Sequence, residues 1–144
     1  MATYDFSSKV ALVTGGASGI GRACAAAFAA GGASVVIADY DEDEGRQTAE
    51  ELSADGAPVS FVAVDVSRPE QCEAMVRHAV EEHGGLHIAV NNAGIGGDQA
   101  PVGEYPVDGW DRVIAINLSG VFYGMRYEIP AMLEAGGGSI VNMA

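Results

Sequence analysis

Short apolar runs alternate with helical patterns along the whole chain, and this alternation limits the possible folds more than any other feature of the sequence. Runs of the kind that a strand buried on both faces requires lie at residues 9–14, 34–38, 59–64, 86–90 and 139–143. Helical patterns separate them, at about residues 19–30, 41–54, 72–80 and 107–133. Strands connected through helices form a parallel sheet with right-handed crossovers. The sequence therefore predicts an α/β fold with a doubly wound parallel sheet that ends after its fifth strand.

Residues at the helix ends add local detail to this prediction. Gly31 and Gly32 end the first helical pattern, and the three glycines at residues 136–138 end the last one. Ser67 and Glu70 have the three-residue spacing of a capping box, in which each side chain bonds a free backbone N–H group of the other residue. This spacing predicts that the third helix begins at Ser67.

The size and charge of the chain restrict its partners. A chain of 144 residues, 49% of them hydrophobic, can form one domain with a core of its own. Its net charge of −13 repels the phosphates of nucleic acids and anionic lipid surfaces. The apolar stretch at residues 23–30 is far shorter than the ~20 residues that cross a bilayer, and residues 1–9 do not have the pattern of a signal peptide. We expect a single domain over residues 1–144, located in the cytoplasm, with no nucleic-acid or membrane partner.

The cysteines and histidines do not have the spacing of metal ligands. Cys24 and Cys72 stand alone, without C-x-x-C spacing, and each falls on the apolar side of a helical pattern. We interpret both as reduced core residues. His78, His83 and His87 do not share one helix face, since a Gly84-Gly85 turn separates the last two. They are interpreted as surface residues, and no metal site is expected.

A glycine-rich segment follows the first predicted strand. Residues 14–21 read T-G-G-A-S-G-I-G and lead directly into the first helical pattern. In this position backbone N–H groups and the positive end of a helix can hold a pyrophosphate, and glycines allow the phosphate to come close. A simple turn would also collect glycines, but the flanking strand and helix favour phosphate binding. The candidate binding residues are Gly15, Ser18, Gly19, Ile20 and Gly21.

An acidic residue ends the second predicted strand. Asp39 lies about 20 residues beyond the glycine loop, where a carboxylate can accept hydrogen bonds from both hydroxyls of an adenosine ribose. Alternatively, Asp39 is a helix N-cap. A 2′-phosphate would meet the charge of Asp39 without a nearby Lys or Arg, which favours NAD(H) over NADP(H). Tyr40 either flanks the adenine or is a plain surface residue.

Four separated motifs of the chain resemble one protein family. The segment T-G-G-A-S-G-I-G at residues 14–21 is similar to the T-G-x-x-x-G-x-G motif of short-chain dehydrogenases/reductases. Residues 65–66 (D-V), 91–94 (N-N-A-G) and 114–117 (I-A-I-N) are similar to further motifs of that family, in the same order. The resemblance implies an NAD-binding Rossmann domain. It covers residues from about 8 to 144, which correspond to the first part of a family domain, so the domain is expected to be incomplete at its C-terminal end.

The resemblance also implies roles for individual residues. Asp65 is expected to bond the adenine amino group, and the backbone of Val66 a ring nitrogen. Asn92, Ala93 and Gly94 are expected to line the ribose on the nicotinamide side, while Asn91 would brace the sheet. Together with the loop, Asp39 and Tyr40, these residues complete the expected cofactor site.

Asn117 is the candidate catalytic residue within the chain. It falls inside an apolar stripe of the last helical pattern, and a buried amide there needs hydrogen-bond partners. It is either a core asparagine satisfied by the backbone or, as the resemblance implies, the family's catalytic asparagine, which holds a water in a proton relay. The Ser, Tyr and Lys of that relay are expected beyond residue 144. None of the five tyrosines has a lysine four positions later.

Three functions remain open from the sequence. The first is an NAD(H)-dependent oxidoreductase that transfers hydride between nicotinamide and a secondary alcohol or ketone, with residues 1–144 alone expected to be inactive. The second is a non-catalytic NAD-binding module or an inactive fragment. The third is an S-adenosylmethionine methyltransferase, which the N-N-A-G motif argues against.

The apolar stripe of the last helix bears on the assembly of the protein. It is wider than contact with one sheet requires, so part of it is expected to meet another surface. Its members are Trp110, Val113, Ile114, Leu118, Val121, Phe122, Met125, Ile129, Met132 and Leu133. The resemblance implies that this surface pairs with a second copy of the protein. We expect a homo-oligomer, either a dimer or a tetramer.

Overall fold

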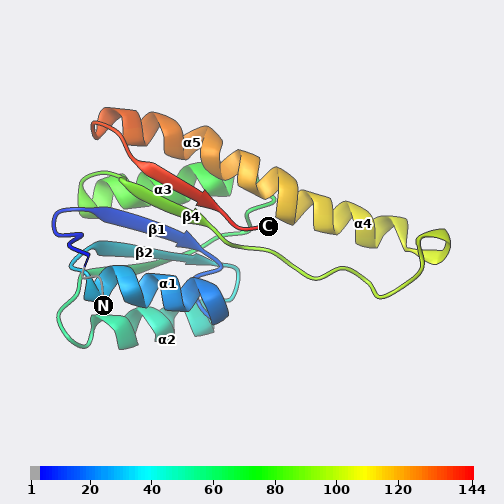
Figure 1. Cartoon of the computed structure of the whole chain (residues 1–144), viewed down its shortest axis with the longest axis horizontal. Coiled ribbons are helices and arrows are strands. Elements are labelled where there is room, and N and C mark those ends of the chain that lie inside the picture. The colour runs from blue at the N-terminus through cyan, green and yellow to red at the C-terminus, as the bar shows by residue number, and fades with distance from the viewer. Residues whose placement is uncertain (1–3) are drawn as a thin grey trace.

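The five apolar runs form five strands in the computed structural model, which describes residues 4–144. The strands are β1 (Val10–Thr14), β2 (Ser34–Asp39), β3 (Val59–Ala63), β4 (Ile88–Asn91) and β5 (Ser139–Asn142). All neighbouring strands are parallel, and their order is β3-β2-β1-β4-β5 (Figure 1). The chain therefore reverses its direction of winding between β1 and β4. The predicted doubly wound α/β fold is confirmed.

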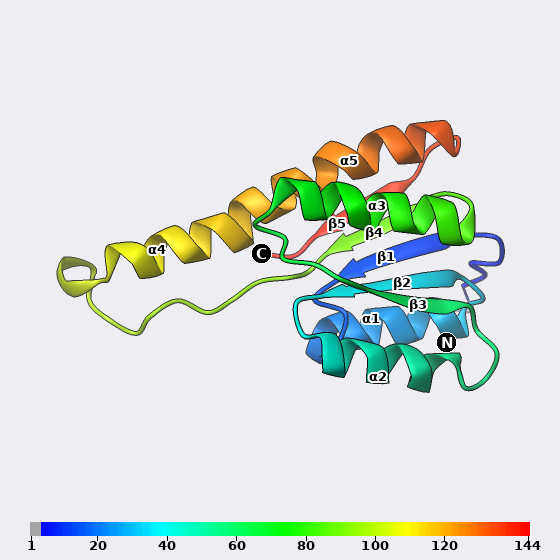
Figure 2. The same ribbon diagram turned by 180° about the vertical axis from the view of Figure 1, so that it is seen from behind.

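Helices cover both faces of the sheet. The helices α1 (Gly19–Ala30) and α2 (Glu42–Ser53) lie on one face, and α3 (Pro69–His83) and α5 (Gly120–Glu134) lie on the other (Figure 2). Successive strand residues serve opposite faces, since side chains alternate along a strand. Val13 packs in the cluster beneath α1 and α2, whereas Leu12 packs in the cluster beneath α3 and α5. This two-sided burial explains why the strands read as unbroken apolar runs.

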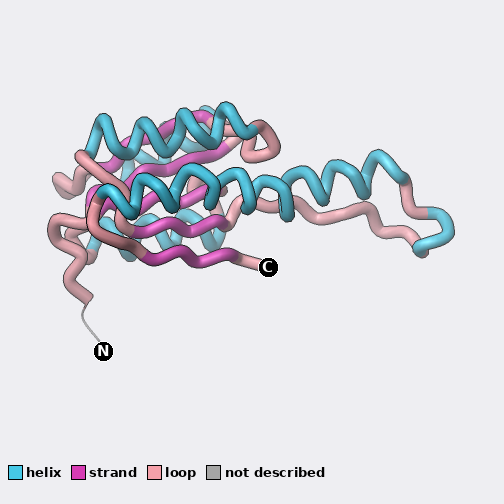
Figure 3. Tube along the Cα trace, turned by 90° about the horizontal axis from the view of Figure 1, so that it is seen from above, coloured by secondary structure: helices cyan, strands magenta, loops and turns pink. Residues whose placement is uncertain are grey.

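One segment projects from the body of the molecule. After β4, residues 95–106 run past the carboxyl ends of the strands and include a short 3₁₀ helix, η1 (Val102–Glu104). The chain then returns along α4 (Val107–Val113) and a π-helical stretch, η2 (Ile114–Ser119), which continues into α5 (Figures 1 and 3). We call residues 95–119 the arm. Its apolar side chains are largely exposed, with Val102 96% and Leu118 64% accessible to solvent.

The capping box predicted at the start of α3 is wrong. The helix begins at Pro69, and its N-cap is Arg68 in an extended conformation. The hydroxyl of Ser67 donates instead to Oδ1 of Asp65, at 2.6 Å. Proline fixes the backbone angle that the first helical residue needs and holds the preceding residue in an extended conformation, so Pro69 sets the start of the helix.

Only part of the apolar stripe predicted for the last helix packs against the body, as its width indicated. The residues of α5 that are buried against the body are Gly120, Gly124, Glu128 and Met132, spaced four apart. Five large apolar side chains of the predicted stripe are exposed instead, and we call them the outer row: Trp110, Leu118, Phe122, Ile129 and Leu133. The glycines explain the difference, because a Cβ atom at Gly120 would lie 2.8 Å from the Val66 side chain. The helix approaches the body on its smallest residues, which turns the large ones outward.

The histidines differ from their prediction as surface residues. Nε2 of His78 and Nε2 of His83 both lie within hydrogen-bond distance of the Ser60 hydroxyl, at 2.9 and 2.8 Å. His87 accepts a hydrogen bond from the backbone N–H of Val10 through Nδ1, at 3.0 Å. All three are half-buried. The predicted surface role is wrong because each ring finds a polar partner at the sheet.

The remaining expectations concern thiols, metals and membranes. Cys24 and Cys72 are free thiols, the first half-buried and the second buried. Between residues 4 and 144, three or more metal-ligating side chains do not come together at any point. None of the helices in this part of the chain is long and apolar enough to span a bilayer.

Candidate functional site

A cleft of about 930 Å³ lies at the carboxyl ends of the strands, beside the point where the winding reverses between β1 and β4. In doubly wound sheets this is where ligands bind. Ten of the residues predicted to bind a cofactor line the cleft: Gly15, Ser18, Ile20, Asp39, Tyr40, Asp65, Val66, Asn92, Ala93 and Gly94. Gly19, Gly21 and Asn117 do not line it. The fold thus brings four separated motifs to one place.

Three glycines of the loop after β1 are required by its geometry. Gly15 and Gly19 have φ angles of 61° and 54°, a left-handed conformation that side chains rarely adopt. A Cβ atom at Gly21 would collide with the carbonyl oxygen of Gly15. Ser18, the N-cap of α1, makes no side-chain hydrogen bond to the first turn of the helix. The first backbone N–H groups of α1 are therefore not taken by a side-chain cap and can bind an anion.

A hydrogen-bonded clamp joins this loop to the segment after β4. The hydroxyl oxygen of Thr14 accepts hydrogen bonds from the backbone N–H groups of Asn92 and Ala93, both at 3.0 Å. The side-chain amide of Asn92 donates to the carbonyl oxygens of Thr14, at 3.0 Å, and Gly15, at 3.2 Å. These hydrogen bonds hold the glycine loop and the segment after β4, which form two walls of the cleft, in a fixed relative position. Sequence reasoning missed the role of Thr14, although this residue opens the glycine motif.

Asp39 is the last residue of β2 and lies at the edge of the cleft. Its Oδ2 accepts a hydrogen bond from the Ala17 N–H at 3.0 Å, and its Oδ1 accepts one from the Asp41 N–H at 3.1 Å. The alternative role of Asp39 as a helix cap is wrong, because Asp41 caps α2. Each carboxylate oxygen has a further lone pair, so the oriented group can accept hydrogen bonds from two hydroxyls. Tyr40, 80% exposed, stands on the rim.

Asp65 and Val66 follow β3 along the same edge. Oδ1 of Asp65 accepts hydrogen bonds from both the N–H and the hydroxyl of Ser67, which fixes the orientation of the carboxylate. Within residues 4–144 the other oxygen accepts no hydrogen bond, so it can accept one from an amino group of a ligand. Val66 is buried beneath Gly120 of α5 and also lines the cleft.

The sequence predicted that Asn117 is buried. In the structure this residue is exposed, in the π-helical stretch of the arm. Its Oδ1 accepts from the N–H of Ile95 and its Nδ2 donates to the carbonyl of Ile95, both at 2.9 Å. The side chain therefore pairs through both of its polar groups with one backbone residue of the segment after β4. The wider turn of η2 moves Asn117 off the apolar face that regular helical spacing would give it. Such π-helical stretches frequently occur at functional sites.

The walls of the cleft include residues that the sequence analysis did not single out. Arg112 of the arm lines it and lies 3.9 Å from the carboxylate of Asp98. The rest of this set is apolar or small and includes Ala38, Val64, Ile95 and Gly96. Residues of these types carry no motif, so only their place in the fold identifies them.

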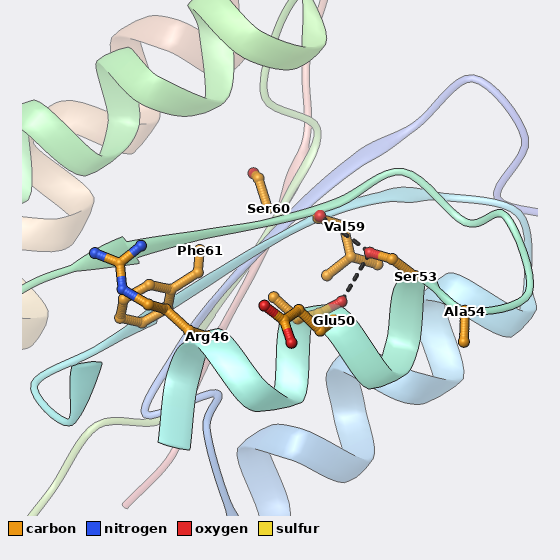
Figure 4. Close-up of a pocket in the computed structure, with 8 residues that line it drawn as sticks. Arg46, Glu50, Ser53, Ala54, Val59, Ser60 and Phe61 are labelled. Carbon is orange, nitrogen blue, oxygen red and sulfur yellow. Dashed lines mark hydrogen bonds between the residues drawn. The ribbon is translucent and has the colours of Figure 1, made fainter. Parts of the chain in front are cut away.

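A second hollow, between α2 and β3, is a poorer candidate. It has a volume of about 440 Å³ and lies against Arg46, Glu50, Ser53 and Phe61 (Figure 4). The hydroxyl of Ser53 is used by the backbone of Ala49 and Val59, and the guanidinium of Arg46 lies over the ring of Phe61. Ser60 points to the other side of the strand (Figure 4). The polar groups of Ser53, Arg46 and Ser60 are thus occupied or turned away from this hollow, and none of the motif residues lies there.

The comparisons with known proteins agree with the geometry of the first cleft. The family model for short chain dehydrogenases matches residues 9–144. The chain belongs to the short-chain dehydrogenase family. A family member of known structure, a short chain dehydrogenase/reductase from Burkholderia phymatum in complex with NAD, superposes with a TM-score of 0.93 at 39% identity. The match covers 98% of this chain and 50% of that one.

Two curated relatives are dehydrogenases by their names. Cyclohexanol dehydrogenase from Acinetobacter sp. (strain SE19) is 45% identical over 96% of this chain and 55% of its own length. The 3-alpha-(or 20-beta)-hydroxysteroid dehydrogenase from Mycobacterium tuberculosis (strain ATCC 25618 / H37Rv) is 46% identical over 94% of this chain and 51% of its own. The chain thus spans about half the length of the curated relatives it matches.

Proposed function

We propose that the protein to which this chain belongs binds NAD(H) and transfers hydride between the nicotinamide and a secondary alcohol or ketone. The observation that carries the proposal is the carboxylate of Asp39, held by two backbone N–H groups at the edge of a cleft that the glycine loop also lines. The names of the dehydrogenase relatives and the NAD complex of the Burkholderia phymatum protein support it.

The cleft fits a dinucleotide in extent and in chemistry. In this proposal the loop residues Gly15, Ser18, Gly19, Ile20 and Gly21 form the pyrophosphate site, where the N-terminus of α1 attracts negative charge. Asp39 accepts hydrogen bonds from the adenosine ribose, beside Tyr40. Asp65 and Val66 bind the adenine, and Asn92, Ala93 and Gly94 bind the nicotinamide side. The bound NAD supplies the hydride acceptor, while these residues hold and orient it.

Asn117 is proposed as the catalytic residue that this chain contributes. Each polar group of its side chain is bonded to Ile95 but keeps one free site, the second lone pair of Oδ1 and the second hydrogen of Nδ2, so a water of a proton relay can bond the side chain as well as the main-chain carbonyl. The pair with Ile95 joins the two ends of the arm. The Ser, Tyr and Lys that complete the relay are proposed to lie after residue 144 of a longer protein, where the Tyr acts as general acid and base.

Calorimetric titration of the full-length protein with NADH and with S-adenosylmethionine tests the proposal, because a methyltransferase also pairs a glycine loop with an acid after the second strand. We expect saturable binding of NADH and none of S-adenosylmethionine. NAD reduction by a panel of secondary cyclic alcohols, followed by absorbance, then tests catalysis. Binding of S-adenosylmethionine without NADH would overturn the proposal, whereas NADH binding without turnover would favour a non-catalytic NAD module.

We further propose that the protein forms a homo-oligomer, a dimer or a tetramer, and works in the cytoplasm. The outer row supports the first point, since five large apolar side chains lie exposed along one helical run. The free thiols of Cys24 and Cys72 support the second, because such thiols persist in reducing compartments.

A further inference from the structure

The middle of α5 buries a carboxyl group in the body of the protein. Glu128 is 0% exposed and is one of only four polar or charged residues among 4–144 that are buried, with Thr14, Thr48 and Asn91. It belongs to the line of α5 that faces the sheet, between Gly124 and Met132. A glutamate is almost never buried in this way unless it is paired, so its surroundings need an explanation.

The contacts of Glu128 connect three elements. Its Oε2 accepts a hydrogen bond from Nδ2 of Asn91 in β4, at 3.0 Å, and the same Nδ2 donates to Oδ1 of Asn142 in β5, also at 3.0 Å. Oε1 is buried and has no hydrogen-bond partner among the described residues. A Cβ atom at Gly124 would lie 2.7 Å from Asn91 Oδ1 and 3.0 Å from Glu128 Oε1. The lack of a side chain at Gly124 thus leaves space for the side chains of Asn91 and Glu128.

Among residues 4–144 no cationic side chain pairs with Glu128. Burial raises its pKa to about 7, against the opposing effect of the Asn91 hydrogen bond. On α3 the pKa of the Cys72 thiol is raised to about 12, mainly by burial and further by Glu128, so this thiol is neutral at pH 7. The strands β4 and β5 present the amides of Asn91 and Asn142, and on α5 the side chains of Arg126 and Glu134 are exposed to solvent.

Asn91 links this cluster to the cofactor cleft. It is the last residue of β4, and its carbonyl accepts a hydrogen bond from the N–H of Met143 at 3.0 Å, just after β5. The next two residues along the chain, Asn92 and Ala93, donate to Thr14 and form the wall of the cleft. The groups that bind the side chain of Asn91 therefore also fix the start of this wall, at Asn92.

We propose that Glu128 is a positioning residue of the cofactor site, which as a neutral acid holds Asn91 and, through Asn91 and Asn142, fixes the ends of β4 and β5. This inference rests on the proposed binding of NAD(H) beside residues 92–94. Glu128 itself does not line the cleft. Its contribution reaches the cofactor through the clamp between Asn92 and Thr14.

The first test compares melting temperatures of the full-length protein and its Glu128→Gln variant from pH 5 to pH 8. The folded pKa of about 7 lies above the ordinary value of 4.5, so the stabilisation from the bound proton is complete below pH 4.5 and is lost as the pH rises to 7. Glutamine keeps a neutral hydrogen-bonding group at every pH. We expect the two proteins to melt together at pH 5 and the variant to melt about 5 °C higher at pH 8.

The matched control for this test is Glu134→Gln, which removes an exposed carboxylate from the same helix. Its pH profile should run parallel to that of the unmodified protein. Parallel profiles for Glu128→Gln and the unmodified protein would show that Glu128 is not a buried neutral acid and would overturn the inference. This arm does not depend on any ligand.

The second test measures NADH affinity at pH 6 by fluorescence titration. We expect Glu128→Gln to bind NADH within about twofold of the unmodified protein, and Glu128→Leu, which leaves Asn91 without its acceptor on α5, to bind about 5- to 50-fold more weakly. Equal affinity of Glu128→Leu and the unmodified protein would overturn the positioning role and leave the proposed function standing. Failure of the unmodified protein to bind NADH would instead overturn the proposed function. If Glu128→Leu does not fold, the pH profile of Glu128→Gln decides.

Discussion

Apolar residues are buried in the packed body of the protein, whereas several of them are exposed in the arm. In the body, valines and leucines of β1 and β2 are completely buried between two layers of helices. In the arm, Val102, Val107 and Leu118 are mostly exposed. Both regions reach the cleft, since the body supplies the glycine loop, Asp39 and Asp65, while the arm supplies Ile95, Arg112 and Ile116.

The structure of the body is determined by contacts within residues 4–144, whereas the exposed apolar side chains of the arm need a further surface to cover them. The glycine loop and the Asp39 carboxylate are fixed by backbone hydrogen bonds within the body. The pair between Asn117 and Ile95 joins the two ends of the arm to each other, and several apolar side chains between them are exposed to solvent. Three pairs of variants test this contrast.

The largest expected effect comes from matched valines. Val36 is completely buried in β2, whereas Val102 on the arm is 96% exposed. Val36→Ala should lower the free energy of unfolding by about 2–4 kcal/mol, since it removes buried methyl groups and leaves a cavity. Val102→Ala should change it by less than ~0.5 kcal/mol. Urea unfolding of both variants measures the contrast, and equal losses would break it.

A second pair compares glycines. A Cβ atom at Gly21 would collide with the Gly15 carbonyl and crowd the Asn92 amide, while one at Gly103 in the arm would meet no atom within 4 Å. Gly21→Ala should therefore cost about 1–3 kcal/mol of stability and weaken NADH binding. Gly103→Ala should be neutral or stabilise by a few tenths of a kcal/mol, roughly the effect of reduced freedom in the unfolded chain. Unfolding and NADH titration of the same samples show whether Gly21→Ala stands apart. An unaffected Gly21→Ala protein would contradict the geometry of the loop.

The third pair tests whether the outer row is an interface. Lysines at Leu118 and Phe122 should raise the dissociation constant of the assembly by about tenfold or more, or ~1.4 kcal/mol, because charges would be buried there. Val80→Lys is the control, since Val80 is an exposed apolar residue of α3 away from the outer row. Light scattering across a dilution series gives the masses. An unmodified protein that is monomeric at all concentrations would refute the assembly proposal.

The sequence predicted the body well because burial on two faces and the glycine loop leave direct traces in the residues. The five strands begin and end within two residues of their predicted positions, and Asp39 ends β2 as expected. The prediction of a capping box failed because Pro69 outweighed the spacing of Ser67 and Glu70. The histidines were misjudged because their partners, Ser60 for His78 and His83 and the Val10 N–H for His87, carry no signal in the sequence.

The last helix was harder to predict, for a physical reason. Large apolar residues dominate its sequence, but the helix packs on Gly120 and Gly124, whose small size permits close approach. The four-residue spacing of these glycines, continued by Glu128 and Met132, is the signal that could have identified the buried face. The π-helical turn that exposes Asn117 has no such signature, and so its side-chain pair with Ile95 could not be foreseen.

The central claim is that the oriented carboxylate of Asp39 makes this cleft a site for NAD(H) and not for NADP(H). Fluorescence titration of the full-length protein with both reduced cofactors, before and after Asp39→Ala, tests it most directly. We expect tighter binding of NADH than of NADPH, and a loss of about 1.5–3 kcal/mol in NADH binding for the variant, the usual range for hydrogen bonds to a charged group. The variant should also bind the two cofactors more equally, since the charge that opposes a 2′-phosphate is gone. Equal affinity of the unmodified protein for NADH and NADPH would contradict the account.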